Sequence, residues 1–186
     1  MSIDIALVHY PVSDKRGDVA ATSITNFDIH DLARAARTYG VSRYYIVSPI
    51  KSQKDFAQRI IRHWSDGYGS EYNPSRGTAL EIAKIIDDIS EIVEDVEDRM
   101  DKPGPVFVGT SAKEHPNTVM FRDMRKKLKE DRKHYCLVFG TGWGIHPSLL
   151  MDLDFILEPV RGVGSYNHLS VRSAVSIILD RLLGEW

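Results

Sequence analysis

Short runs of β-branched and aromatic residues alternate along this chain with longer stretches whose apolar residues recur every three or four positions. The first two runs cover residues 3–8 and 41–47, and a helical pattern extends between them from about Asn26 to Tyr39. The runs predict buried strands, and the recurrence predicts amphipathic helices. Strands that alternate with helices are typical of α/β domains. We therefore expect a mostly parallel sheet with helices on both faces.

The same alternation continues to the end of the chain. Further helices are expected at residues 52–64, 80–100, 116–129 and 169–183, and further strands at 106–108, 135–139 and 154–157. Between the first elements, we expect Asn26 or Asp28 to cap a helix that stops at Gly40. Loops are expected at 11–25 and 67–77. The 186 residues fit a single domain over residues 1–186 and are enough to bury a hydrophobic core.

The cysteine content and the lack of long apolar runs exclude several classes of protein. The single cysteine, Cys136, cannot form an intramolecular disulfide, and the sequence predicts no metal site. No basic segment precedes the first apolar run, which therefore does not resemble a signal peptide. No window approaches the roughly 18 uninterrupted apolar residues of a membrane span. We expect a cytoplasmic protein without a membrane anchor.

The net charge of −2 hides a separation of charge along the sequence. Residues 80–101 carry a net charge of −7, which leaves +5 for the rest of the chain. Bases gather in residues 15–62 and 122–133. Most such runs are solvated helix faces. The small net charge therefore does not exclude a nucleic-acid partner.

One basic segment, residues 59–68, also contains aromatic side chains. Its basic and aromatic residues are Arg59, Arg62, His63, Trp64 and Tyr68. Aromatic rings stack on unpaired bases while arginines contact phosphates, so the segment suits RNA. The alternative is a helix end with Trp64 packed into the core.

Three predicted strands end in unusual loops, which begin near Gly109, at Gly140 and at Glu158. In an open parallel sheet, ligands bind beyond the carboxyl ends of the strands. Glycine allows close approach of the backbone to a ligand. A dinucleotide site at Gly140 is disfavoured because the third glycine of the motif would fall at position 145, which is Ile. A P-loop is excluded because no Gly-Lys-Ser/Thr sequence occurs.

The residues around these loops resemble the motifs of a known superfamily. Residues 137–144 read Leu-Val-Phe-Gly-Thr-Gly-Trp-Gly, and residues 165–171 read Ser-Tyr-Asn-His-Leu-Ser-Val before an apolar helix. Both are similar to the C-terminal motifs of the SPOUT superfamily of RNA methyltransferases. Residues 31–41, with an Arg-Ala pair on a helix that ends in an aromatic residue and Gly, resemble its N-terminal motif. Taken whole, the chain resembles a stand-alone bacterial group, and a related domain is attached to tRNA guanine-N1 methyltransferases.

The resemblance implies a fold and an activity. It implies an α/β domain with a C-terminal trefoil knot, a feature that composition and periodicity cannot indicate. It implies S-adenosyl-L-methionine as the cofactor, RNA (tRNA or rRNA) as the substrate, and a homodimer. The last helix, 169–183, also favours a dimer because it is apolar nearly all round. The chain departs from the family at Asp28, where Asn is usual, and at Thr141, where Glu is common.

In this interpretation the three loops cradle the cofactor. The residues expected to bind it are Gly109, Thr110, Phe139, Gly140, Thr141, Gly142, Trp143, Leu157, Pro159, Val160, Tyr166, Asn167, His168, Leu169 and Ser170. The alternatives are ordinary turn chemistry for the glycines, a core position for Trp143, and helix capping by Asn167 or Ser170. Capping and ligand binding are compatible, because a helix N-terminus is rich in donors.

Arg34 is the first catalytic candidate. It can orient a phosphate bidentately or stabilise charge that develops on the methylated base. The alternative is a surface arginine paired with Asp28 or Asp31. Arg16 and Asp18 form a second group, with His9 and Asp14 beside them, since a carboxylate near an arginine can accept a proton. Asp18 alternatively makes a turn.

The sequence thus favours an S-adenosylmethionine-dependent RNA methyltransferase. A second hypothesis is a cofactor-binding, RNA-binding module without methyl transfer activity. A third is a structural dimerisation domain, which predicts neither cofactor binding nor salt-dependent retention of RNA.

Overall fold

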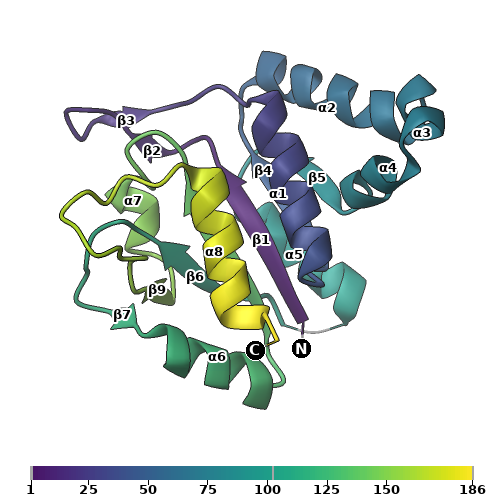
Figure 1. Ribbon diagram of the computed structural model, residues 1–186. Helices are drawn as coiled ribbons and strands as arrows, with labels where there is room; N and C mark the ends of the chain where they lie inside the picture. Colours follow the sequence, from purple (N-terminus) through teal and green to yellow (C-terminus); the bar gives the residue numbers. More distant parts are fainter. Residues whose placement is uncertain (1, 102, 186) are drawn as a thin grey trace.

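The computed structural model describes residues 2–101 and 103–185. Within them, seven parallel strands form one sheet, and two short strands form a separate hairpin (Figure 1). The strands of the sheet are β1 (Ser2–Val8), β4 (Tyr44–Val47), β5 (Ala83–Ile86), β6 (Val106–Thr110), β7 (Thr118–Val119), β8 (His134–Gly140) and β9 (Phe155–Leu157). The hairpin consists of β2 (Val12–Ser13) and β3 (Val19–Ala20). The helices are α1 (Asn26–Thr38), α2 (Lys51–Ser65), α3 (Tyr68–Tyr72), α4 (Pro74–Leu80), α5 (Glu91–Met100), α6 (Phe121–Glu130), α7 (Pro147–Leu150) and α8 (Val171–Leu183).

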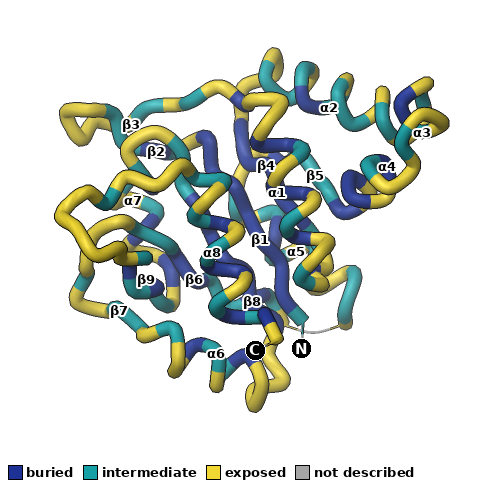
Figure 2. The backbone as a smooth tube through the Cα atoms, in the orientation of Figure 1, coloured by how far each residue is buried: buried dark blue, intermediate teal, exposed yellow. Residues whose placement is uncertain are grey.

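The order of strands in the sheet is β5-β4-β1-β8-β6-β9-β7, and every neighbouring pair is parallel. β1 lies inside the sheet and is buried over most of its length (Figure 2). Its side chains alternate between two hydrophobic clusters. Ile5 and Leu7 pack with residues of α1, α2, α4, α6 and α8, whereas Ala6 and Val8 pack with residues of α5 and α7. The mostly parallel sheet with helices on both faces is therefore confirmed.

Helix α1 begins and ends with recognisable signals. Its N-cap is Thr25, whose side chain accepts from the backbone N–H of Asp28, while the Asp28 carboxylate accepts from the Thr25 N–H. This capping box places the cap one residue before the earlier of the two expected positions. At the other end, Gly40 has a φ of +70°, and Val41 N–H donates to the carbonyl of Ala36 at 2.9 Å. The predicted stop at Gly40 is confirmed as a Schellman motif.

The prediction of one helix over residues 80–100 is wrong. Residues 83–86 form strand β5, which pairs with β4 at the edge of the sheet, and α5 begins only at Glu91. The chain turns between them, where the Glu91 carboxylate accepts from the backbone N–H of Asp87 at 2.8 Å. The spacing of Ile82, Ile85 and Ile86 suits either structure, and the distant partner β4 selects the strand. The acidic residues consequently lie outside β5, mostly in the turn that follows it and in α5.

Smaller corrections concern the loops and the boundaries of two helices. The expected loop at 67–77 contains α3 and most of α4, and the polar stretch 11–25 contains the β2–β3 hairpin. The basic helix begins at Phe121 rather than at residue 116, because residues 118–119 form β7. Cys136 is buried in β8, as expected. Across the two described ranges, every helix is too short or too polar to cross a bilayer. The C-terminal knot stays a prediction.

Candidate active site

The carboxyl ends of β8, β6 and β9 lie next to one another in the sheet. Gly109 of β6 is in register with Val138 of β8, and Thr110 is in register with Leu157 of β9. Since all three strands are parallel, the loops that follow them leave from the same edge (Figure 1). We refer to residues 111–117, 141–146 and 158–170 as the first, second and third rim loops.

Side-chain contacts tie the third rim loop to the first and to the start of α6. Asn167 Nδ2 donates to the carbonyl oxygen of Ala112 at 3.1 Å, and Arg161 pairs with Glu114. The Glu158 carboxylate accepts from the backbone N–H of Phe121 at 2.5 Å. The first and third rim loops, which are far apart in the sequence, are therefore held together.

The second rim loop turns so tightly that β8 must end in glycine. A Cβ on Gly140 would lie 2.4 Å from the backbone nitrogen of Ile145 and 2.8 Å from the carbonyl carbon of Gly144. Gly144 itself has a φ of +100°. Trp143, between the glycines, is 65% exposed, so it does not plug the core. The other alternative for Trp143, a wall beside a ligand, remains.

The N-terminal polar stretch packs directly on the second rim loop, which sequence reasoning missed. Ser13 N–H donates to the carbonyl of Gly144 at 2.9 Å, and Trp143 N–H donates back to the carbonyl of Ser13 at 3.3 Å. Val12 bridges Ile145 in an antiparallel manner. The signal was the unusual length of the polar stretch, which did not identify the surface against which it lies.

His9 stands below this contact and is fully buried. Its Nδ1 shares a hydrogen bond with Thr22 Oγ1 at 3.1 Å, and Thr22 in turn contacts the hydroxyl of Thr141. Burial lowers the pKa of His9 to about 4, against a weaker opposing effect of Asp28. The imidazole is therefore neutral near pH 7. Its Nε2 has no hydrogen-bond partner among the described residues.

Arg16 and Asp18, the second catalytic group, lie at the exposed tip of the hairpin. The Asp14 carboxylate accepts from the backbone N–H groups of Arg16 at 2.7 Å and of Asp18 at 2.9 Å, which shapes the tip. Asp14, rather than Asp18, therefore makes the turn. Within residues 2–101 and 103–185, the side chains of Arg16 and Asp18 contact neither Arg34 nor the buried His9 through a hydrogen bond or ion pair.

Arg34 lies on the exposed surface of α1. The carboxylates expected to pair with it face Arg172 of α8 instead, at 4.0 Å for Asp28 and 3.3 Å for Asp31. In the described part of the chain, the Arg34 guanidinium forms no hydrogen bond or ion pair. It is therefore available to a ligand.

Helices α1 and α8 pack side by side, and a polar cavity of about 560 Å³ opens between them. It is lined by Asp31, Ser170, Arg172, Ser173, Ser176 and Ile177. Ser170 caps α8, since its side chain accepts from the backbone N–H of Ser173 at 3.3 Å. Asn167 is not the cap, which leaves its contact with Ala112 as its role in the described structure.

The remaining expected cofactor residues divide into buried and exposed sets. Phe139 and Leu157 are buried in the core and form the floor beneath the loops. Gly109 also faces the interior, where a Cβ would lie 2.7 Å from Leu153 Cδ1. Tyr166 is 79% exposed and meets His168 edge to face at 5.1 Å.

This arrangement suits a ligand with a flat ring and polar edges. Exposed apolar side chains of Trp143, Tyr166 and Leu169 accompany the backbone groups of glycine turns. Pockets for nucleotide-like ligands combine apolar walls with a few placed polar groups. The donor set therefore fits S-adenosylmethionine, whose adenine and ribose offer such a ring and such edges.

The chain is similar to several known proteins. A family model described as SAM-dependent RNA methyltransferase matches residues 2–184. A protein of Aquifex aeolicus (strain VF5), named only as uncharacterized, is 44% identical over 181 residues, which cover 97% of this chain and 88% of the relative. A tRNA (guanine-N(1)-)-methyltransferase of Oleidesulfovibrio alaskensis is 43% identical over 97% of this chain, which spans only 41% of that relative's length.

A solved structure shares the fold. The SpoU methyltransferase AviRb from Streptomyces viridochromogenes, in complex with the cofactor AdoMet, superposes with a TM-score of 0.57 and 17% identity. The match covers 98% of this chain and 56% of AviRb. The expected SPOUT-like α/β fold is thus confirmed, while its knot stays a prediction. Together with the family match over almost its whole length, this means that the chain belongs to the SAM-dependent RNA methyltransferase family.

Proposed function

We propose that this protein transfers a methyl group from S-adenosylmethionine to a nucleotide of tRNA or rRNA, and that the three rim loops bind the cofactor. The observation that carries the proposal is their convergence at the carboxyl edge of β8, β6 and β9, with exposed aromatic side chains and glycine turns. The likeness to a relative named as a tRNA methyltransferase supports a tRNA substrate.

S-adenosylmethionine supplies a methyl group on a positively charged sulfur. The protein's task is chiefly to hold the methyl carbon in line with a nucleophilic atom of the RNA. Backbone groups of the second and third rim loops hold the adenine and ribose, and Trp143, Tyr166 and Leu169 shield the ring from water. The Asn167–Ala112 contact fixes the third loop against the first.

Arg34 is the proposed group that acts on the RNA. It is exposed, and the neighbouring carboxylates are held by Arg172. A guanidinium can bind a phosphate bidentately or stabilise charge on the attacked base. Arg16 and Asp18, at the tip of a hairpin that packs on the second rim loop, are the reserve candidates.

We further propose a cytoplasmic homodimer that uses the α1/α8 surface. Phe27 of α1 is 63% exposed and lies 5.1 Å from the guanidinium of Arg172, and Ile177 of α8 is half-exposed nearby. Sedimentation velocity tests the dimer. A protein that stays monomeric at high concentration would contradict it.

Two measurements test the function. Calorimetry should show binding of S-adenosylmethionine near micromolar and no binding of NAD. Mass mapping of nucleosides in RNA from cells with and without the protein should identify one methylated nucleotide that depends on it. Failure to bind either the cofactor or its demethylated product would contradict the proposal. Cofactor binding without methyl transfer would favour an RNA-binding module instead.

The Arg34→Ala variant separates binding from transfer. We expect its cofactor affinity to be unchanged and its methyl transfer to fall by about 10²-fold or more, the scale of losing one electrostatic group. The matched control is Arg37→Ala, an exposed arginine on the same helix. A fully active Arg34→Ala variant would remove this residue from the mechanism.

A further inference from the structure

Helix α2 carries apolar side chains that the rest of the fold covers only in part. Of its 15 residues only Ala57 is fully buried. Phe56, Ile60 and Trp64 are half-exposed and follow one another at intervals of four residues. This spacing places them along one face of the helix. Packing against the core accounts for the buried part of these side chains but not for the part that remains exposed.

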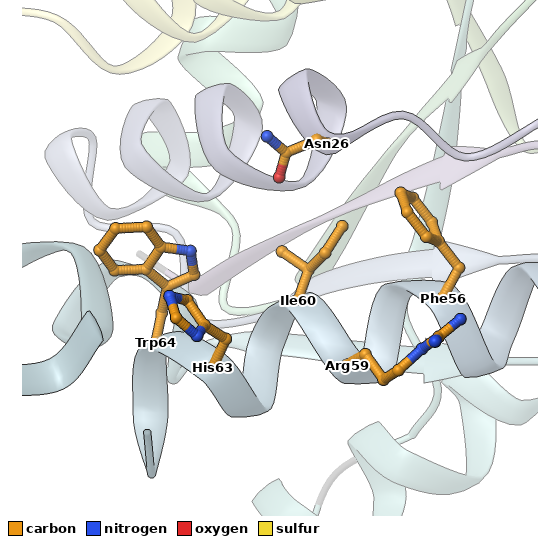
Figure 3. A pocket seen from close by; sticks show the side chains of 6 residues that line it. All are labelled: Asn26, Phe56, Arg59, Ile60, His63 and Trp64. Carbon is orange, nitrogen blue, oxygen red and sulfur yellow. The ribbon is translucent and has the colours of Figure 1, made fainter. Parts of the chain in front are cut away.

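An open cavity of about 460 Å³ lies along that face (Figure 3). We call it the α1–α2 pocket, and it is lined by Asn26, Phe56, Arg59, Ile60, His63 and Trp64. Asn26, at the start of α1, lies across from Ile60. The Asn26 amide offers both donors and an acceptor, and it forms no hydrogen bond within the part of the chain that the structure describes.

The aromatic end of the pocket is held in place. Arg76 of α4 lies 4.4 Å from the Trp64 ring centroid, and His30 of α1 meets the ring edge to face at 5.5 Å. Gly69 packs so closely on the indole that a Cβ there would lie 2.7 Å from it. The alternative in which Trp64 packs into the core is therefore confirmed only in part. The ring packs against the core on one side and lines the pocket on the other.

The charge around the pocket is positive. The Arg59 guanidinium is exposed and makes no hydrogen bond or ion pair with any described residue. Its charge also acts on the Asp55 carboxylate one turn earlier, which Lys51 already binds. The two lysines of α2 already form ion pairs, Lys51 with Asp55 and Lys54 with Asp87. An apolar floor with aromatic rings, an amide opposite and a free guanidinium at the rim complements a nucleobase and its phosphate better than an apolar peptide.

We infer that the α1–α2 pocket binds an unpaired base of the RNA, with Arg59 on a neighbouring phosphate. This inference rests on the proposed function only in taking RNA as the substrate. The pocket is a second contact, because α2 contacts β5 at one edge of the sheet, while the rim loops follow β8, β6 and β9 toward the other edge (Figure 1). The two regions connect through the polar stretch, whose Ile24 N–H donates to Gln53 of α2 at 2.7 Å.

The test compares binding of two fluorescent RNAs to the full chain by anisotropy. One probe is a short unstructured RNA of alternating C and A, and the other is a fully paired duplex of the same length. The test variants are Arg59→Ala with His63→Ala, both exposed side chains, and separately Phe56→Ala. The matched control is Arg62→Ala, an exposed arginine on the same helix that does not line the pocket.

We expect both pocket variants to bind the single strand about tenfold more weakly, the scale of one lost base stack. Duplex affinity and the Arg62→Ala control should be unchanged. Arg59→Ala alone should also reduce the slope of log affinity against log salt by about 0.7, as for one phosphate contact on a single strand.

Three results would overturn the inference. These are unchanged single-strand affinity in both pocket variants, an equal loss for the duplex or for Arg62→Ala, and self-association of the wild type that Phe56→Ala abolishes, which would assign the pocket to a second copy. Calorimetry of the same variants with S-adenosylhomocysteine keeps the two proposals apart. A wild-type chain that does not bind this compound would contradict the proposed function while leaving the pocket result to stand.

Discussion

The two ends of the same parallel sheet are built from opposite kinds of contact. At the amino end, Asp4 of β1 is fully buried and accepts from Arg99 Nη2 at 2.6 Å, with His134 Nε2 at 2.7 Å. At the carboxyl end, Trp143 and Tyr166 are largely exposed on the rim loops. The amino end directs its polar groups inward, and the carboxyl end leaves side chains free to meet a ligand.

The amino-end network extends across β4, β5 and α5. Tyr45 donates to the Asp95 carboxylate at 2.5 Å, and Lys84 pairs with the same carboxylate. Burial opposes ionisation of Asp95, but the hydrogen bonds from Lys84 and Tyr45 outweigh it and lower the pKa of this carboxyl group. Burial and Asp95 also raise the pKa of Tyr45. Because these charged groups are paired with one another, we assign them to the stability and specificity of the fold rather than to catalysis.

The largest effect in this comparison is expected from Asp4→Ala. The substitution removes the carboxylate that Arg99 and the fully buried His134 share, and leaves Arg99 only its ion pair with Asp95. We expect the free energy of unfolding to fall by about 3–5 kcal/mol. Urea denaturation measures it. The matched control is Asp18→Ala at the exposed hairpin tip, which should change stability by less than about 0.5 kcal/mol. Equal losses of unfolding free energy in the two variants would show that the buried network at the amino end contributes no more to stability than the exposed hairpin tip.

His9 tests whether the carboxyl end also contains a buried titratable group. Its pKa is lowered from 6.5 to about 4 by burial, so the unfolded chain binds a proton more readily than the folded one. The stability that this group confers is complete above pH 6.5 and is lost as the pH falls from 6.5 toward 4. The loss should reach about 3 kcal/mol.

Urea denaturation as a function of pH measures this loss. The His9→Asn variant, which keeps a polar group near Thr22, should show a correspondingly flatter pH dependence over the same interval. Identical profiles for the two proteins would mean that His9 does not titrate as its burial indicates.

Gly140→Ala should damage the carboxyl end alone. Its Cβ would collide with backbone atoms of Ile145 and Gly144, so the second rim loop must shift. We expect a loss of about 1–3 kcal/mol in stability and a loss of more than tenfold in cofactor affinity by calorimetry. Gly162→Ala is the control, because a Cβ at Gly162 has nothing within 4 Å. An intact affinity in Gly140→Ala would separate the second rim loop from the cofactor.

The smallest effect is expected from Asn167→Ala, which removes a hydrogen bond at the exposed edge. Stability should fall by about 1 kcal/mol or less, while cofactor affinity should fall measurably because the third rim loop is no longer tied to Ala112. Ser170→Ala, which removes the cap of α8, should instead cost about 1 kcal/mol of stability. A reversed pattern would mean that Ser170 rather than Asn167 orders the loop.

The sequence predicted the central strands well, and the reason is physical. β1 and β8 are buried on both faces, so most residues in them are apolar. The edge strand β5 could not be predicted in the same way. Its isoleucines fit a helical stripe equally well, and only the pairing of Ile85 with Ile46 of β4 decides between the two.

The candidate site was predictable in part. The glycines and the order of the motifs indicated the three rim loops, because turn chemistry is local. The packing of Ser13 against Gly144, and the choice of Arg172 over Arg34 by Asp31, depend on how distant helices meet. The sequence could not distinguish a buried His9 from an exposed loop histidine, because the burial of a single polar residue at a strand end depends on distant segments that pack over it.

The central claim is that the three rim loops form the cofactor site. Hydrogen–deuterium exchange with and without saturating S-adenosylhomocysteine tests it directly. We expect added protection in residues 109–115, 140–146 and 157–170, with no change in residues 2–5, 95–99 and 134–136 at the amino end of the sheet. Binding without protection of the rim loops, or protection confined to the amino end, would contradict the account.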